Sequence, residues 1–164
     1  MYLLDANVFI EAKNYYYSFI TFPGFWEWLD TEQDKGNIGS IKQIRDELLK
    51  GNDELAEWIK KRKDSSWFLP IDDVVTQQNL GQIATWVMSQ PFKEAAKPEF
   101  LAGGDPWLIA KAKAIGATVV TQETFDAQTK KKVKIPNVCR AFNVPYINTF
   151  GLLEQNGATF IMRD

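Results

Sequence analysis

The sequence predicts a three-layer α/β fold in which helices flank a mainly parallel central sheet. Three observations support this. Residues 2–4 form an apolar run that stops at Asp5, as expected of a buried strand in a parallel sheet. Residues 118–121 are Thr-Val-Val-Thr, β-branched throughout, which favours a central strand. Between such runs lie segments with helical periodicity, and regular strand–helix alternation is typical of parallel sheets.

The first third of the chain is expected to be largely helical after the opening strand. Residues 7–13 and 23–35 have helical patterns. The second begins with Pro23, which suits a first helical turn, and is followed by Gly36, which suits the position after a helix. Residues 38–40 are too few for more than a short strand or turn.

The next segment predicts two more helices and a strand. Ser40 is expected to cap a helix that runs to Lys50, with Gly51 as its stop. A second helix is expected over residues 53–63. The aromatic-rich run at residues 67–69, which is followed by a proline, is typical of a strand.

The middle of the chain predicts one long helix and one irregular stretch. Asp72 or Asp73 is expected to cap a helix that reaches about Gln90. Residues 91–104 contain two prolines and a glycine pair, so we expect a loop or a short helix there.

The clearest helix signal begins at Asp105. Asp105 is expected to be its N-cap, Pro106 its first residue and Gly116 its stop. A last strand and a last short helix are expected at residues 144–149 and 150–156.

The composition excludes several kinds of chemistry. The chain has 164 residues, no histidine and one cysteine, Cys139. Imidazole bases, Ser–His and Cys–His pairs, His-liganded zinc sites and internal disulfides are therefore excluded. The net charge of −2 gives no overall attraction to nucleic acid. The single cysteine, the absence of a signal-peptide pattern and the absence of a long apolar run favour a cytoplasmic protein without membrane association.

Four acidic residues lie where an α/β fold places its ligand sites. Asp5 ends the first strand and Glu123 follows residues 118–121, while Asp105 starts a helix and Glu47 lies late in another. Ligands bind beyond the carboxyl ends of parallel strands. Converging carboxylates repel one another unless a cation lies between them, and oxygen-only ligands suit Mg²⁺ or Mn²⁺. Such a metal supports phosphodiester hydrolysis without histidine.

Three stretches of the sequence, together with Glu47 between them, resemble the PIN-domain ribonucleases. Residues 1–10, Met-Tyr-Leu-Leu-Asp-Ala-Asn-Val-Phe-Ile, resemble the opening strand, aspartate and small polar residue of that family. Residues 104–110, Gly-Asp-Pro-Trp-Leu-Ile-Ala, resemble its third acidic motif, and residues 119–123, Val-Val-Thr-Gln-Glu, resemble its fourth. Glu47 matches the second acidic position. The resemblance spans roughly residues 1–150.

The resemblance implies a Mg²⁺- or Mn²⁺-dependent endoribonuclease, often the toxin of a toxin–antitoxin pair, with residues 1–164 as a single PIN-like domain. It implies that Asp5, Glu47, Asp105 and Glu123 form the catalytic metal site, with Glu123 either as a metal ligand or as a residue that orients one. Asn7 and Thr121 would then hydrogen-bond the acids or the attacking water. The implied reaction is in-line attack of water, which leaves 5′-phosphate and 3′-hydroxyl ends. An antitoxin protein and a second copy of the chain are the expected protein partners.

Two alternatives remain open from the sequence. A PIN-like module that binds RNA or protein without cutting it would have the same fold. A haloacid-dehalogenase-like phosphatase would share the glycine–aspartate pair at Gly104 and Asp105. That chemistry needs a second aspartate two residues after the nucleophile, and this position is Asn7.

Lysine clusters are the candidates for RNA binding, because a backbone-tracking surface must be positive. One cluster starts seven residues after Glu123 and comprises Lys130, Lys131, Lys132 and Lys134. A second run at residues 60–63 equally suits a solvated helix end. Aromatic residues at 14–28 and Trp86 are expected in the core or on a partner surface, with base stacking as the alternative.

Overall fold

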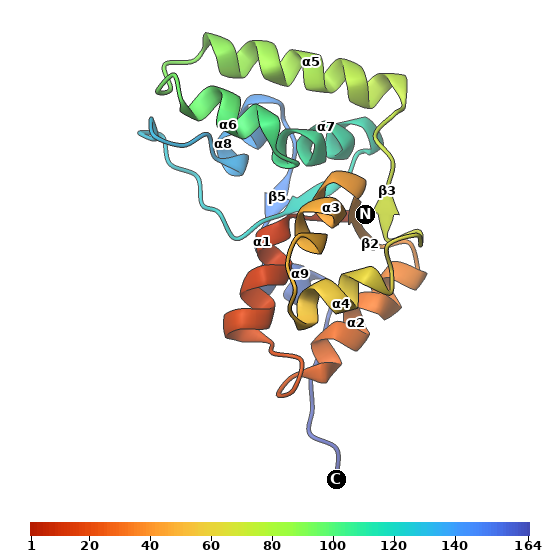
Figure 1. Cartoon of the computed structure of the whole chain (residues 1–164). Helices are drawn as coiled ribbons and strands as arrows, with labels where there is room; N and C mark the ends of the chain where they lie inside the picture. Colours follow the sequence, from red (N-terminus) through yellow and green to blue (C-terminus); the bar gives the residue numbers. More distant parts are fainter.

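Five parallel strands form the centre of the protein in a computed structural model that describes residues 1–164 (Figure 1). The strand order is β3-β2-β1-β4-β5, and every neighbouring pair is parallel. The predicted mainly parallel sheet is therefore confirmed. The strands are β1 (Tyr2–Leu4), β2 (Ile38–Ile41), β3 (Phe68–Leu69), β4 (Thr118–Val120) and β5 (Tyr146–Ile147).

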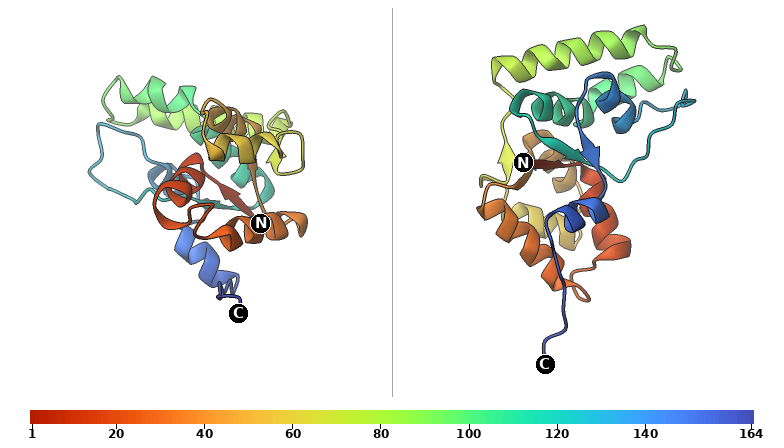
Figure 2. Two further views of the ribbon diagram at one scale, coloured as in Figure 1. Left: turned by 60° about the horizontal axis from the view of Figure 1, so that its bottom comes forward. Right: turned by 180° about the vertical axis from the view of Figure 1, so that it is seen from behind.

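Helices cover both faces of this sheet. Figures 1 and 2 show α5, α6, α7 and α8 on one side and α1, α2, α4 and α9 on the other. The extended C-terminal segment runs away from the second group. The bounds are α1 (Ala6–Glu11), the π-helix η1 (Ala12–Tyr16), α2 (Pro23–Asp34), α3 (Lys42–Leu49), α4 (Glu54–Lys60), α5 (Val74–Ser89), α6 (Ala96–Ala102), α7 (Asp105–Ile115), α8 (Ile135–Ala141) and α9 (Thr149–Gln155). No helix is both long and apolar enough to cross a lipid bilayer.

The parallel register brings the carboxyl ends of the central strands to one edge. Leu4 pairs with Val120, and the backbone N–H of Asp5 donates to the Val120 carbonyl at 3.0 Å. Thr121 continues the pattern by donating to the Ile147 carbonyl at 2.9 Å. The residues that follow β1 and β4 are thus held side by side.

Burial explains why these strands are short apolar runs. Leu3, Leu4, Val119 and Val120 are fully buried, because helices cover the sheet on both faces. Removing this surface from water is the main favourable contribution to folding. The buried strands give the loops at their ends a rigid support.

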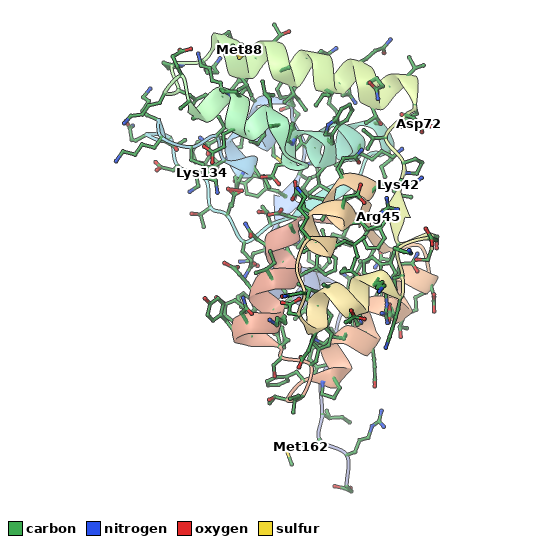
Figure 3. The ribbon with its side chains drawn as sticks, in the orientation of Figure 1. Lys42, Arg45, Asp72, Met88, Lys134 and Met162 are labelled. Carbon is green, nitrogen blue, oxygen red and sulfur yellow. The ribbon has the colours of Figure 1, made fainter.

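The aromatic residues near the N-terminus divide between the interior and the surface. Phe25 of α2 is buried and stacks on Tyr17, the residue after η1, with ring centroids 4.5 Å apart. Tyr15 is 77% exposed, and the neighbouring Tyr16 contacts Phe150 edge to face at 5.1 Å. The prediction that these aromatic residues pack in the core therefore holds for Phe25 and Tyr17 but not for Tyr15 and Tyr16. Figure 3 shows the side chains over the whole fold, with Met88 and Met162 near its opposite ends.

Ser40 does not cap a helix, contrary to the sequence-based prediction. It lies inside β2, where its hydroxyl donates to the Leu4 carbonyl at 2.6 Å and thereby ties β2 to β1. The helix starts two residues later, at Lys42, with Ile41 in extended conformation before it. Serine can occupy either a helix N-cap or a strand. Here the strand extends through Ser40 to Ile41, because residues 38–41 are all buried in the sheet.

The boundaries around α7 differ slightly from the prediction. Gly104 is the N-cap and Asp105 is the first helical residue, so Asp105 is free to turn its carboxyl group away from the helix end. The predicted stop is confirmed, because Gly116 is left-handed with φ of 69°. The structure also contains α8, a helix that the sequence pattern did not predict, and α6 within the stretch expected to be a loop or a short helix.

Candidate functional site

Asp5 lies at the centre of the acidic site, directly after β1. Its side chain is 1% exposed. The Thr121 hydroxyl, which follows β4, donates to Asp5 Oδ2 at 3.1 Å. The same hydroxyl oxygen accepts the backbone N–H of Glu123 at 3.1 Å. Thr121 therefore fixes one acid and the backbone of another, a connection that the parallel pairing of β1 and β4 makes possible.

Asp105 approaches Asp5 from the start of α7. Its carboxyl group is within hydrogen-bonding reach of the Asp5 carboxyl. Burial raises the pKa of Asp105 to about 6, and the negative charges of Glu123 and Glu47 contribute to the increase. Burial also raises the pKa of Asp5 well above its usual range, with Asp105 and Glu123 adding to the shift. The structure thus brings these acids into one mutually repelling group.

Glu47 is held at the edge of this group by the backbone. Gly104 donates its N–H to Glu47 Oε1 at 2.6 Å, which joins the second turn of α3 to the start of α7. Glycine is needed here for space, since a Cβ at position 104 would lie 3.0 Å from Glu47 Oε1 and 3.0 Å from Ile44 Cδ1. The sequence identified Glu47 as an acid but did not predict this contact.

Glu123 faces a lysine from its own loop. Lys132 Nζ lies 2.9 Å from Glu123 Oε1. This oxygen is fully buried, and no donor, Lys132 included, meets it with the geometry of a hydrogen bond. The second oxygen, Oε2, accepts the backbone N–H of Ile135 at 3.4 Å. Partial burial acts to lower the pKa of Lys132, but its close contact with the Glu123 carboxylate and the negative charges of Glu123, Asp105 and Asp5 raise it above its ordinary value. The ion pair therefore neutralises Glu123 without a well-aligned hydrogen bond.

The donor set fits a hard divalent cation in its chemistry but is not closed around one point. All four candidate ligands offer carboxylate oxygens, the preferred ligands of Mg²⁺ and Mn²⁺. The repulsion that raises the pKa of Asp5 and Asp105 is what such a cation would relieve. However, no three acids are gathered tightly enough to hold a metal ion as they stand. Glu47 Oε1 accepts the N–H of Gly104 and Glu123 Oε1 contacts Lys132, so one oxygen of each of these acids is already engaged.

The remaining candidate residues lie around this group in different ways. Asn7 occupies the first turn of α1 and forms no hydrogen bond with the acids. Lys130 and Lys131 are exposed on the loop between β4 and α8, and the partly buried Lys134, labelled in Figure 3, is the residue before α8. The Lys130 carbonyl accepts the N–H of Lys93 at 2.9 Å, which anchors the loop to the residues before α6.

One side chain near the site was not anticipated from the sequence. Gln43, one turn before Glu47 on α3, has a fully buried Oε1 with no hydrogen-bond partner. No sequence signal distinguishes it from any other glutamine on a helix. The lone thiol is inert by contrast, because burial raises the pKa of Cys139 to about 12, with Glu123 and Asp5 adding to the shift.

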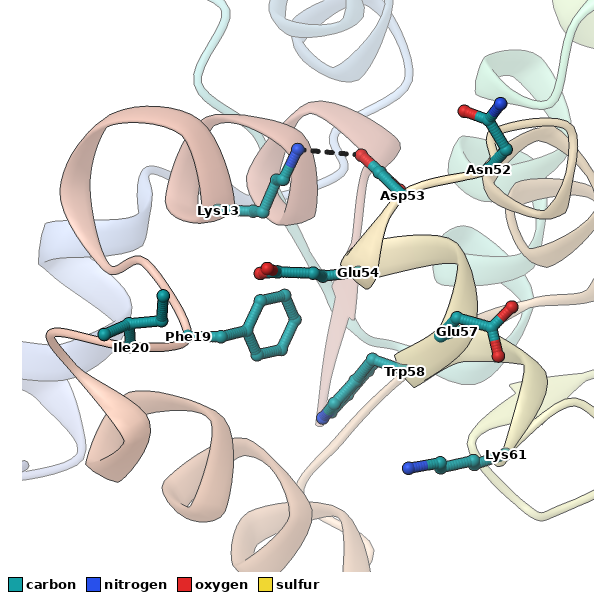
Figure 4. Close-up of a pocket in the computed structure, with 9 residues that line it drawn as sticks. All are labelled: Lys13, Phe19, Ile20, Asn52, Asp53, Glu54, Glu57, Trp58 and Lys61. Carbon is teal, nitrogen blue, oxygen red and sulfur yellow. Dashed lines mark hydrogen bonds and ion pairs between the residues drawn. The ribbon is translucent and has the colours of Figure 1, made fainter.

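Two hollows in the surface differ in their chemistry. One of about 180 Å³ adjoins the acids and is lined by Glu47, Asp105, Lys132 and neighbouring residues of α6. Another of about 790 Å³ lies between η1 and α4, with Phe19 and Trp58 on its walls (Figure 4). None of the four acids lines this larger hollow. Of these two hollows, only the smaller one is bordered by candidate acids, Glu47 and Asp105.

Comparisons with known proteins agree with the fold described above. Residues 2–160 match the family described as "Domain of unknown function (DUF4411)". Among curated proteins, no significant match was found. The crystal structure of FitAcB from Neisseria gonorrhoeae is similar over 92% of this chain and 99% of that chain, with 21% sequence identity and a TM-score of 0.54. The chain belongs to the DUF4411 family and has a PIN-like fold.

Proposed function

We propose that this DUF4411 protein is a Mg²⁺- or Mn²⁺-dependent endoribonuclease that hydrolyses RNA phosphodiester bonds. The observation that carries the proposal is the pairing of Asp5 with Asp105 at the carboxyl edge of a parallel sheet. Both have a raised pKa, partly because of the other acids. Buried like charges are costly unless a partner compensates them, so the group is suited to a cation. The PIN-like fold and the resemblance of the acidic motifs to PIN-domain ribonucleases support the same reaction.

The proposed roles of the residues follow from their contacts. Asp5, Glu47, Asp105 and Glu123 would hold the cation. When bound, such a cation activates water for attack and offsets the negative charge that develops on the phosphoryl group. Thr121 orients Asp5 through its hydroxyl and Glu123 through its backbone. Gly104 orients Glu47. Hydrogen bonds of this kind tune metal sites, and their loss typically costs about 10- to 100-fold in affinity or activity.

RNA is proposed to approach along the loop between β4 and α8. Lys130 and Lys131 are exposed there, and Lys134 is the last residue before α8. Three positive charges on the segment that follows Glu123 would allow a polyanion to bind although the whole chain has a net charge of −2. Contacts to phosphates carry no base specificity, so this loop would position the strand rather than select its sequence.

We further propose that the protein is the toxin of a toxin–antitoxin pair. The proposal rests on the resemblance of the acidic motifs to PIN-domain ribonucleases and on the PIN-like fold. An antitoxin protein would then be the natural partner, and a homodimer remains a prediction. Expression of the wild-type chain in a bacterial host should arrest growth, whereas expression of Asp5→Asn should not. Equal growth with both chains would argue against the toxin role while leaving the ribonuclease proposal open.

The ribonuclease proposal is tested by incubating the purified protein with RNA in Mn²⁺, in Mg²⁺ and in EDTA. We expect metal-dependent internal cleavage that leaves 5′-phosphate and 3′-hydroxyl ends. A phosphate monoester such as p-nitrophenyl phosphate should not be hydrolysed. RNA binding without cleavage in either metal would instead identify an inert PIN-like module, and monoester hydrolysis would favour the phosphatase alternative.

Gly104→Ala is expected to lower cleavage about 10- to 100-fold, because the new methyl group would displace the Glu47 carboxylate. Gly104 has helical backbone angles that alanine adopts readily, so the expected effect is a local clash. Gly103→Ala is the matched control, since a Cβ there would lie at an ordinary 3.6 Å from Glu47 Oε1. Initial cleavage rates of the two variants should differ clearly. Equal rates would show that the position of Glu47 does not matter.

A further inference from the structure

We infer that Lys132 is a tethered cation that occupies the acidic site in the metal-free protein and competes with the divalent cation for Glu123. The inference rests on the proposed function and concerns the regulation of the same site. Lys132 lies 2.9 Å from Glu123 Oε1 and lines the small hollow together with Asp105 and Glu47. Lys132 thus contacts one of the four acids and borders the same hollow as two others.

Lys132 is the only lysine or arginine that forms an ion pair with any of the four acids. The other ion pairs of the protein, such as Lys111 with Asp73, lie elsewhere. Three or four carboxylates held together without a cation would repel strongly at neutral pH. One internal ammonium group relieves part of this repulsion, because its Coulomb attraction acts on Glu123 directly and on Asp105 and Asp5 from further away.

The ion pair between Lys132 and Glu123 can separate without a change in the core. The Glu123 side chain is 9% exposed, whereas that of Lys132 is 63% exposed. Lys132 therefore reaches inward from a surface loop, and rotation about its side-chain bonds is enough to remove the ammonium group. The loop backbone stays anchored, since Thr129 Oγ1 donates to the Lys132 carbonyl at 2.7 Å and the next residue, Val133, is buried.

Competition follows from the space and the charge at one buried oxygen. Glu123 Oε1 is buried, and Lys132 Nζ lies 2.9 Å from it, while Oε2 already accepts the backbone N–H of Ile135. A divalent cation that binds Oε1 would need the place of the ammonium group and would be repelled by its positive charge. The displaced ammonium group then remains at the mouth of the site, where a phosphate of the substrate would attract it. Lys132 would accordingly weaken metal binding and couple it to substrate binding.

The test measures Mn²⁺ affinity by isothermal titration calorimetry on the full chain without RNA. Lys132→Met should bind Mn²⁺ about tenfold more tightly than the wild type, because the competing charge is gone. Lys132→Arg keeps the charge and should retain near wild-type affinity. Lys131→Met removes a charge from the same loop without touching an acid, so its Mn²⁺ affinity should change by less than about twofold. Thermal denaturation in EDTA checks that each variant is folded.

The outcomes separate this inference from the proposed function. If the wild type binds Mn²⁺ and Lys132→Met binds it no more tightly, the competition is refuted and the ribonuclease proposal stands. If the Mn²⁺ affinity of Lys131→Met increases as much as that of Lys132→Met, the increase comes from the lower positive charge of the loop, and the specific role of Lys132 is refuted. If neither the wild type nor Lys132→Met binds Mn²⁺, the proposed function fails and the inference fails with it.

Discussion

Asp5→Asn is expected to reduce Mn²⁺-dependent RNA cleavage by at least about 100-fold while leaving the fold intact. Loss of a residue that merely supports a ligand costs about 10- to 100-fold, so loss of a central ligand should cost no less. The amide has the size of the carboxyl group, and its oxygen can still accept the Thr121 hydroxyl. Because Asp5 is buried among other acids, removing its charge should not lower stability at neutral pH.

Cleavage rates and Mn²⁺-dependent shifts in melting temperature measure both parts of this prediction. In the wild type, Mn²⁺ at 100 times its dissociation constant should stabilise the fold by about 2.7 kcal/mol. For a chain of this size that corresponds to a rise in melting temperature of roughly 5–10 °C. Asp5→Asn should lose the rise. Asp72→Asn, which removes an exposed carboxylate, should keep both the rise and the cleavage. Full cleavage by Asp5→Asn would place the metal site elsewhere.

The strand ends explain why sequence patterns alone located the acids. Asp5 and Glu123 follow short apolar runs that favour buried strands, and the parallel pairing of β1 with β4 brings the ends of both strands to the same edge. Asp105 was found because its helix has strong end signals, although Gly104 rather than Asp105 is the cap. The helix α8 was missed because it is short and follows a lysine-rich loop whose composition gives no periodic pattern.

The contacts that control the acids could not be predicted in the same way. The hydrogen bond between Gly104 and Glu47 joins residues 57 positions apart, and it depends on how α3 packs against the start of α7. The ion pair between Lys132 and Glu123 depends on the path of an irregular loop. Periodicity and capping rules describe local structure, so they identify which residues lie at the site but not which partners hold them.

Asp105→Asn is expected to stabilise the metal-free protein, and by more at pH 7.5 than at pH 4. The pKa of Asp105 rises from an ordinary 3.8 to about 6 on folding. Well below pH 4 the group carries a proton in both states and costs nothing. Between about pH 4 and pH 6 the unfolded state has lost its proton while the folded state still keeps it, so stability falls as the pH rises; above pH 6 both states are ionised and the cost is complete. The full cost is about 3 kcal/mol, since one pKa unit corresponds to 1.36 kcal/mol.

Unfolding by guanidinium chloride in EDTA, at several pH values between 4 and 7.5, measures the difference between wild type and Asp105→Asn. Carboxylates with lowered pKa values, such as Asp53 and Asp73, stabilise the folded protein less in acid. This loss is the same in both proteins, so it cancels from the difference between their free energies of unfolding. The neutral amide also removes one of the charges that raise the pKa of Asp5, so the gain in stability at pH 7.5 should be at least the contribution of Asp105 itself.

Mn²⁺ should make the wild type the more stable of the two proteins at pH 7.5, because it stabilises the ionised wild-type site and finds one ligand fewer in the variant. A stability difference that is independent of pH would show that Asp105 ionises normally, and the repulsion on which the proposed metal site depends would then be absent.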